Sequence, residues 1–231
     1  INKSEKITGC LVGEPTNVNK MGDTIKIGRR GSFTGSLIVK GIQGHVGYPD
    51  LAENPINSLL KMLEPFSKIY LDKGTNEFQP SSVMITTIDV NNDASNVIPG
   101  EVKAKFNIRF NTLHSVASLK SMLKNQFDTI TKNYEFDYFC NAEPFLTSDE
   151  ELKSTLQNAI TKVVNVNPEK STTGGTSDAR FIAKLCPVIE FGLVGKTMHK
   201  IDENVETDDI IKLTSIYNKF LHNYFRVEKN D

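Results

Sequence analysis

An alternating pattern in residues 101–110, EVKAKFNIRF, constrains the fold more than any other feature of the chain. Every second side chain is apolar, and these five share one face of an extended backbone: Val102, Ala104, Phe106, Ile108 and Phe110. A period of two predicts a strand whose sheet is buried on one face only. The β-branched segment 82–90, SVMITTIDV, precedes it and is expected to pair with it.

Two amphipathic helices accompany these strands, at residues 53–66 and 115–130. The first helix begins with Asn54 as a predicted N-cap and Pro55 at the first helical position. Further strands are predicted at residues 24–42, as one long strand or a bent pair broken near Gly31, and at residues 134–139. The resulting order, βαββαβ, is that of a split ferredoxin-like unit.

Helices and apolar strands also alternate on both sides of this unit. They are predicted in the following order: a strand at 7–13, a helix at 150–164, a glycine-rich turn at 171–181 followed by a short helix, a strand at 188–194 and a last helix at 208–225. Such alternation is typical of an α/β layer with a partly parallel sheet. We therefore expect a unit of about residues 26–142 inserted into an α/β domain formed by residues 1–25 and 143–231.

Charge and composition narrow the classes of partner. With 27 Lys and Arg against 28 Asp and Glu, the net charge is -1, which argues against nucleic acid and favours a small-molecule ligand. No apolar run reaches the roughly 18 residues of a membrane helix. The three cysteines are far apart and odd in number, which favours a reducing compartment and a cytoplasmic location. Since the chain opens at Ile1, the lack of a leader carries little weight.

Two side chains at strand ends are candidate metal ligands. Glu14 follows the strand at 7–13, and His199 follows the strand at 188–194. Carboxylate and imidazole are both zinc ligands, but a zinc site needs three or four protein ligands, and the chain has no HExxH or HxD motif. Taken alone, Glu14 is also compatible with a surface carboxylate before Pro15, and His199 with an ordinary loop histidine.

Two glycine-rich segments are candidate binding loops. Residues 172–181, TTGGTSDARF, could point backbone N–H groups at an anionic or carbonyl oxygen, or could form a turn with no ligand. Residues 41–49, GIQGHVGYP, place His45 among three glycines without the spacing of a dinucleotide-binding loop. Arginines on the predicted strands, Arg29, Arg30 and Arg109, could lie at the surface or bind a carboxylate in bidentate geometry.

Seven motifs taken together carry a resemblance to a known family. In chain order they are GEPT, GRRGS, GIQGHVGYP, NVIPGE, FNIRF, TTGGTSDARF and MHKIDE. Their order and spacing resemble the M20 family of di-metal amidohydrolases over essentially the whole chain. Within that family they are more similar to members that act on N-succinyl-diaminopimelate than to those that act on acetylornithine. The resemblance implies a partial zinc-peptidase-like α/β catalytic domain with an inserted ferredoxin-like βαββαβ lid that forms a homodimer.

The resemblance also implies a role for individual residues. Glu14 would bind one zinc and His199 the other, while His45 would reach across the dimer and stabilise the tetrahedral oxyanion in the partner's active site. The succinyl and diaminopimelate ends of the substrate would be held by Arg29, Tyr48, Asn96, Arg109, Gly175, Thr176 and Ser177. Two departures from the family pattern, Ser95 and Gly195 in place of asparagines, are expected to loosen substrate contacts.

The implied reaction is hydrolysis of N-succinyl-diaminopimelate to succinate and diaminopimelate, with two zinc or cobalt ions, in bacterial lysine and cell-wall synthesis. The family's N-terminal half is not among these 231 residues, and it carries the HxD motif, the bridging Asp, the second metal carboxylate and the general-base Glu. We therefore expect this chain alone to bind metal weakly or not at all and to be inactive. The alternatives are another N-acyl amino acid deacylase of the family, similar to acetylornithine deacetylase, or a non-catalytic dimerising fragment.

Overall fold

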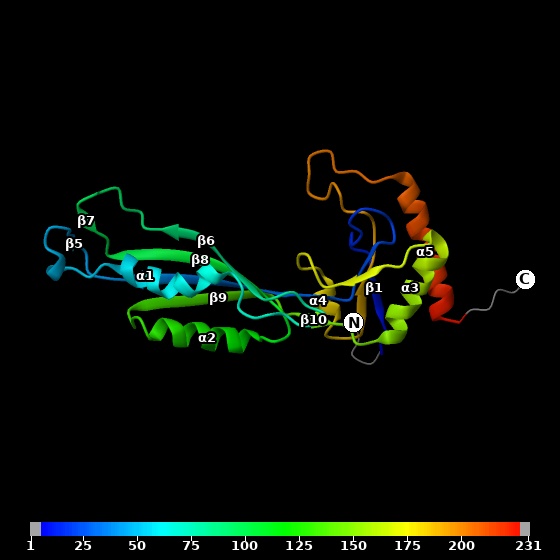
Figure 1. Ribbon diagram of the computed structural model, residues 1–231, viewed down its shortest axis with the longest axis horizontal. Helices are drawn as coiled ribbons and strands as arrows, with labels where there is room; N and C mark the ends of the chain where they lie inside the picture. Colours follow the sequence, from blue (N-terminus) through cyan, green and yellow to red (C-terminus); the bar gives the residue numbers. More distant parts are fainter. Residues whose placement is uncertain (1–5, 227–231) are drawn as a thin grey trace, which may run out of the picture. The chain divides into compact units, whose positions relative to one another are not determined.

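The computed structural model describes residues 6–226 and divides into two compact units. The inserted unit is Arg30–Pro144, and the flanking unit contains the residues up to Arg29 and from Phe145 on (Figure 1). Residues 26–29, which the sequence pattern assigned to the insert, lie with the flanks. The predicted segments 1–25 and 143–231 extend at their outer ends beyond the described residues.

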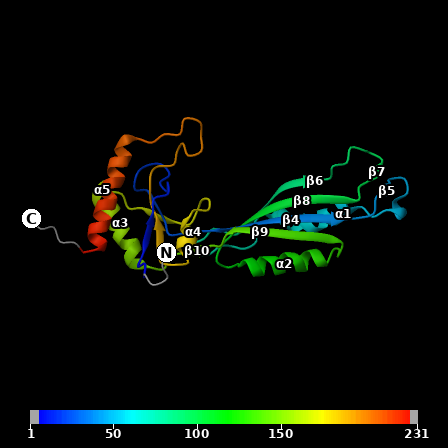
Figure 2. The same ribbon diagram turned by 180° about the vertical axis from the view of Figure 1, so that it is seen from behind.

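The inserted unit is a four-stranded sheet with two helices. Its elements are β4 (Gly31–Lys40), α1 (Pro55–Leu63), β6 (Ser82–Asp89), β8 (Glu101–Phe110), α2 (Val116–Asp128) and β9 (Tyr134–Ala142). The strands lie in the order β6-β8-β4-β9, and every neighbouring pair is antiparallel (Figures 1 and 2). The predicted βαββαβ order, the span of β8 and the pairing of residues 82–90 with 101–110 are confirmed.

Helix α1 begins as its sequence predicts. The side chain of Asn54 accepts a hydrogen bond from the backbone N–H of Ile56 at 3.0 Å, and Pro55 occupies the first turn. This cap satisfies one of the donors that a helix N-terminus leaves free. The helix ends in a 3₁₀ turn, Glu64–Lys68, which carries Phe66 into the core.

Aromatic side chains fill the space between the sheet and its helices. Phe106 is fully buried at the centre of β8, with its ring centroid 5.0 Å from that of Phe66 and 6.3 Å from that of Phe136. On the neighbouring strand, a Cβ atom at Gly35 would come within 2.2 Å of the Phe106 ring. Gly35 therefore leaves the space that this ring occupies.

The flanking unit has a small mixed sheet covered by long helices. Its elements are β1 (Cys10–Val12), β2 (Thr24–Lys26), β3 (Gly28–Arg29), β10 (Phe145–Leu146), α3 (Glu150–Val164), β11 (Glu169–Ser171), α4 (Ala179–Ile182), β12 (Val188–Glu190) and α5 (Thr207–Tyr224). The sheet order is β1-β12-β2-β11, with β1–β12 and β2–β11 parallel and β12–β2 antiparallel. The predicted partly parallel α/β layer is confirmed.

The prediction of one long strand or a bent pair at residues 24–42 is wrong. This segment forms three strands, since β2 belongs to the flanking sheet, β3 pairs with β10, and β4 enters the sheet of the inserted unit. Apolar residues fall at odd-numbered positions both in β2 (Ile25) and in β4 (Phe33, Leu37 and Val39), so this spacing does not reveal the change of sheet between them.

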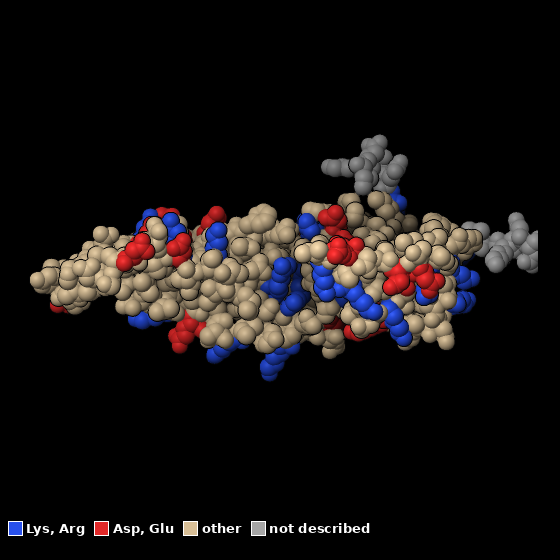
Figure 3. Space-filling model, turned by 90° about the horizontal axis from the view of Figure 1, so that it is seen from above, with Lys and Arg blue, Asp and Glu red and all other residues tan. Residues whose placement is uncertain are grey.

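The distribution of charge on the surface and the character of the helices agree with the near-zero net charge and with the lack of a long apolar run in the sequence. In Figure 3, basic and acidic side chains are interspersed over the face shown, as the near-zero net charge leads one to expect. No helix within residues 6–226 combines the length and the apolar character needed to cross a membrane.

Truncation of Phe106 tests the core of the inserted unit. We expect Phe106→Ala to lower the free energy of unfolding by about 3–5 kcal/mol, because it removes a fully buried ring and leaves a cavity. Urea denaturation followed by circular dichroism measures this. Lys103→Ala, an exposed position on the same strand, is the control, with a change within about 0.5 kcal/mol. A loss below about 1 kcal/mol for Phe106→Ala would contradict the assigned core.

Candidate active site

The two candidate metal ligands follow neighbouring parallel strands. Strands β1 and β12 pair in register from Cys10 opposite Val188 to Val12 opposite Glu190, so their carboxyl ends lie at the same edge of the sheet. The segments that follow are joined by Asn17, whose Nδ2 donates to Gly192 O at 2.6 Å and whose carbonyl accepts from Gly195 N at 3.0 Å. This edge is where open α/β sheets bind their ligands.

Glu14 and His199 each carry a donor group of a type that binds zinc. Glu14 is half-buried. His199 is exposed in a loop and has a positive φ of 61°, and its backbone N–H donates to Glu203 Oε2 at 3.2 Å. A carboxylate and an imidazole are suitable zinc ligands, but a site needs at least three. Within residues 6–226 no three His, Cys, Asp or Glu side chains are grouped to hold a metal. The donor types fit zinc, and their number is incomplete.

The predicted substrate-binding turn lies directly against Arg29. Its guanidinium Nη1 donates to the carbonyls of Thr173 at 3.2 Å and Gly175 at 3.3 Å. Gly174 has a φ of 104°, and a Cβ atom there would lie 2.6 Å from Arg29 Nη1. Both the left-handed backbone and the close approach of the guanidinium require glycine at this position. Arg29 is 8% exposed, so it lies beneath the turn.

A fully buried carboxylate, that of Glu190 on β12, holds Arg29 and the turn together. Oε2 accepts from Arg29 Nε at 2.9 Å and from Nη2, while Oε1 accepts from the Ser177 hydroxyl. The structure therefore brings together Arg29, Gly175 and Ser177 of the predicted residues, and adds Glu190, which the sequence analysis missed.

A buried lysine completes this cluster. Lys26 on β2 is 6% exposed, and its Nζ donates to Ser171 Oγ at 3.0 Å and Thr173 Oγ1 at 2.8 Å. Burial, followed by the charge of Arg29, lowers the pKa of Lys26. The sequence analysis missed Lys26 as well, although a charge between Ile25 and Ile27 in an apolar strand could have indicated it.

In the inserted unit, His45 lies in the short strand β5 (Gly44–His45), which pairs with β7 (Val97–Ile98). Its side chain is exposed, and Nδ1 accepts a hydrogen bond from Gly47 N at 3.0 Å. A neutral imidazole with an accepting Nδ1 carries its proton on Nε2. His45 therefore presents an N–H donor from an exposed position.

The glycines around His45 have specific packing roles. A Cβ atom would lie 2.1 Å from Glu53 O at Gly41, 2.7 Å from Ala52 Cβ at Gly44, and 3.1 Å from His45 Nδ1 at Gly47. Gly41 and Gly44 thus let the segment pack against residues 52–53, and Gly47 brings its N–H to the imidazole. These contacts orient the His45 ring within its segment.

Three predicted residues of the inserted unit cluster, and a fourth lies apart. The His45 and Tyr48 rings are 5.8 Å apart, and the carbonyl of Asn96 accepts from Val46 N at 3.0 Å. This cluster adjoins the Glu101 end of β8, since Gly41 N donates to Gly100 O. Arg109 lies eight residues further along β8, which corresponds to about 27 Å of strand. Within one inserted unit, Arg109 does not join His45.

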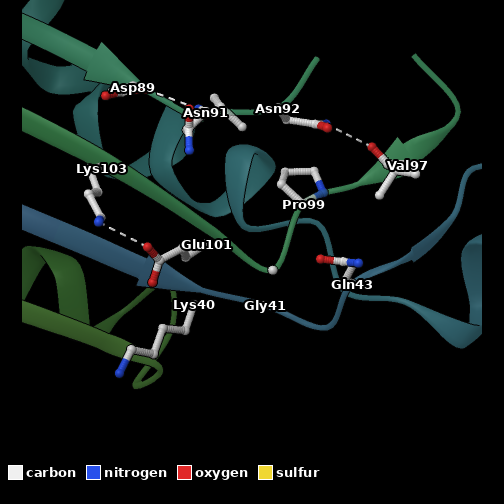
Figure 4. A pocket seen from close by; sticks show the side chains of 12 residues that line it. Lys40, Gly41, Gln43, Asp89, Asn91, Asn92, Val97, Pro99, Glu101 and Lys103 are labelled. Carbon is white, nitrogen blue, oxygen red and sulfur yellow. Dashed lines mark hydrogen bonds and ion pairs between the residues drawn. The ribbon is translucent and has the colours of Figure 1, made fainter. Parts of the chain in front are cut away.

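A polar cavity of about 610 Å³ lies beside the loop that carries Asn96. Figure 4 shows Asn91, Asn92 and Val97 on one side of it and Lys40 and Glu101 on the other, with Asn92 Nδ2 bonded to Val97 O. His45, Tyr48 and Asn96 do not line this cavity. We therefore do not assign it to the candidate site.

Comparison of the sequence with known proteins identifies the family of the chain. Residues 27–135 match the model of a peptidase dimerisation domain of the M20 type. The chain is 53% identical over 227 residues to the succinyl-diaminopimelate desuccinylase of Pelagibacter ubique, and 48% identical over 227 residues to that of Parvibaculum lavamentivorans. The chain belongs to the M20 family. The resemblance stated from the motifs is thereby confirmed.

Solved structures agree on the fold. The aminopeptidase PepT of Bacillus cereus matches with a TM-score of 0.76 at 16% sequence identity. The match covers 92% of this chain and 56% of the PepT chain. An M20 family metallo-carboxypeptidase of Sulfolobus solfataricus has a TM-score of 0.71 at 17% identity and covers 92% and 62%. The alignments with the two desuccinylases include 96% of this chain, but only 59% of the Pelagibacter protein and 58% of the Parvibaculum protein. The chain therefore spans about three fifths of their length.

The number of ligands leads to a prediction about metal. We expect this chain alone to retain little or no zinc after dialysis, because Glu14 and His199 fall short of three ligands. Elemental analysis measures the zinc content, with a Glu14→Gln, His199→Ala double variant as the control for adventitious metal. Near-stoichiometric zinc in the chain that is lost in the double variant would contradict this expectation.

Proposed function

We propose that the complete protein to which this chain belongs hydrolyses N-succinyl-diaminopimelate to succinate and diaminopimelate in the cytoplasm. The observation that carries the proposal is the 53% identity to a succinyl-diaminopimelate desuccinylase over 96% of this chain, a span that includes every candidate site residue. The geometry supports it, because ligand types for metal, a turn with free N–H groups and an N–H donor are all present.

Each group of residues has a role in this proposal. Glu14 and His199 would each hold one of two zinc or cobalt ions, and the bound metal would supply Lewis-acid polarisation of the scissile carbonyl and an activated water. Arg29, Gly175, Thr176 and Ser177 would hold the substrate at the turn. Tyr48, Asn96 and Arg109 would contact it from the inserted unit.

His45 would stabilise the oxyanion. A tetrahedral intermediate of amide hydrolysis carries a negative oxygen, and a preorganised N–H donor stabilises that charge most in the transition state. The bond from Gly47 N to Nδ1 orients the ring and leaves the proton on Nε2, which is the donor that the oxyanion would meet. We propose that His45 acts in the partner subunit's active site.

An assay of the complete protein tests the substrate. We expect hydrolysis of N-succinyl-diaminopimelate to exceed that of N-acetylornithine in kcat/KM. The opposite preference would favour the alternative, an acetylornithine deacetylase-like deacylase. For the isolated chain we propose a dimer without catalytic activity.

Replacing His45 tests the oxyanion role in the complete protein. We expect His45→Ala to lower kcat by about 10²–10³-fold, the usual cost of one such donor, with metal content unchanged. His222→Ala, at a half-buried histidine on α5, is the matched control and should keep kcat near the wild-type value. If His45 only filled a turn, kcat would stay near wild type, and only stability would change, by about 1 kcal/mol or less.

Mixed dimers test whether His45 acts across the subunit boundary. A His45→Ala protein mixed with a full-length variant disabled at its general base should regain activity, because one site of each heterodimer then holds both groups. No recovery after proven subunit exchange would place His45 in its own subunit's site or outside catalysis.

The edges of the inserted sheet suggest where the dimer forms. Strand β9 exposes the charges of Glu135 and Asp137, which discourage pairing at an edge. Strand β6 instead exposes Met84, Ile85 and Ile88, and from Met84 onward its outer edge pairs with no other described strand. We propose a two-fold dimer in which the β6 edges of two copies meet, since closed isologous pairing covers such an edge.

Charges placed on the two edges distinguish them. We expect the double variant Met84→Glu, Ile88→Glu to be monomeric in light scattering at concentrations where the wild-type chain is dimeric. Phe139→Glu, at an exposed apolar position on β9, should remain a dimer. A monomeric Phe139→Glu together with a dimeric β6 variant would overturn this choice of edge.

A further inference from the structure

The flanking unit buries more positive than negative charge beneath the glycine-rich turn. Lys26, Arg29 and Glu190 are 6%, 8% and 0% exposed. Both oxygens of Glu190 are occupied by Arg29 and Ser177. Lys26 contacts only the hydroxyls of Ser171 and Thr173 and, within the described residues, no carboxylate. One buried cation is therefore not neutralised by contact.

Other charged groups near Lys26 do not cancel it directly. The carboxylates of Glu169, Glu190 and Asp23 raise the pKa of Lys26, against burial and Arg29, which lower it. Glu169 is exposed, and Asp23 already accepts the backbone N–H groups of residues 18–20. Because a buried charge without a partner is costly, a fold that retains one usually has a use for it.

The uncompensated charge lies against the turn. Lys26 Nζ is 2.8 Å from the hydroxyl of Thr173, the residue before Gly174. The N–H groups of residues 174–177 donate no hydrogen bond within the described chain. Nearby, Arg180 Nη1 donates to Ser177 O at 3.0 Å, while its Nε is buried with no partner among the described residues. Cations and free N–H groups thus gather around one short segment.

We infer that Lys26 is a specificity-determining residue whose charge selects substrates that place a carboxylate at residues 174–177. The inference rests on the proposed function, in which the substrate carries carboxylates at both the succinyl and the diaminopimelate end. A fixed charge near a bound carboxylate stabilises the ground state and the transition state alike. It therefore acts on KM and leaves kcat unchanged.

The competing explanation is that Lys26 only supports the turn through its two hydrogen bonds. The complete protein with Lys26→Met loses the charge but keeps the length of the side chain. Ser171→Ala, at the end of β11, is the matched control, because it removes one of those hydrogen bonds and keeps the charge. We expect Lys26→Met to raise KM for N-succinyl-diaminopimelate about 10-fold or more with kcat within about twofold, and Ser171→Ala to leave KM within about threefold.

Binding of product analogues separates this inference from the proposed function. Calorimetry with succinate and with diaminopimelate, each alone, requires no turnover. We expect Lys26→Met to weaken binding of at least one of them about 10-fold, which also identifies the end that lies at the turn, and we expect wild-type binding to weaken as salt is added. If the wild type binds these probes but does not hydrolyse the substrate, the proposed function fails and the inference is still tested.

Three results would overturn the inference. They are unchanged binding and KM in Lys26→Met, an equal loss in Ser171→Ala, or no binding of either probe by the wild type. Circular dichroism and thermal unfolding establish that each variant is folded. If Lys26→Met does not fold, Lys26→Gln serves in its place, since it removes the charge but can still donate hydrogen bonds to both hydroxyls.

Discussion

The carboxylate of Glu190 determines the arrangement of the flanking unit. A fully buried charge is stable only when it is paired and hydrogen-bonded, and removing one partner of such a pair costs about 3–5 kcal/mol. Arg29 and the Ser177 hydroxyl meet this requirement. Strand β12, strand β3 and the glycine-rich turn are thereby held at one point. The conformation of the turn, including the positive φ of Gly174, follows from the space that Arg29 occupies.

The inserted unit is held together in a different way. Its interior is apolar and aromatic, centred on Phe106, and the antiparallel register of β4 and β8 sets the positions at both ends of the sheet. The His45 segment lies beyond one of these ends. It depends on two-residue strands and on glycines that allow close backbone contact, so its geometry is fixed locally by steric fit rather than by buried charge.

The success of sequence-based prediction differs between these two kinds of interaction. Residues 101–110 and the Asn54 cap were predicted closely, because a strand face and a helix cap are local patterns. The division of residues 24–40 among three strands was not predicted, because alternating apolar residues do not indicate which sheet a strand joins. Nor was the Arg29–Glu190 pair, whose partners are 161 residues apart. The strands β5 and β7 are too short to leave a pattern.

The positions of the candidate residues bear on the proposed role of a second subunit. His45 and Tyr48 are both exposed, and Nδ1 of His45 is occupied by Gly47, so the donor Nε2 has no acceptor among the described residues of its own unit. An oriented donor contributes to catalysis only where an oxyanion forms, and the candidate metal ligands lie in the flanking unit. Contact between copies through the β6 edge would hold two inserted units in a fixed arrangement. A donor in an exposed loop is preorganised only if the unit that carries it is itself held in place. In the proposed dimer, pairing at the β6 edge would therefore be needed for His45 to act as an oxyanion donor.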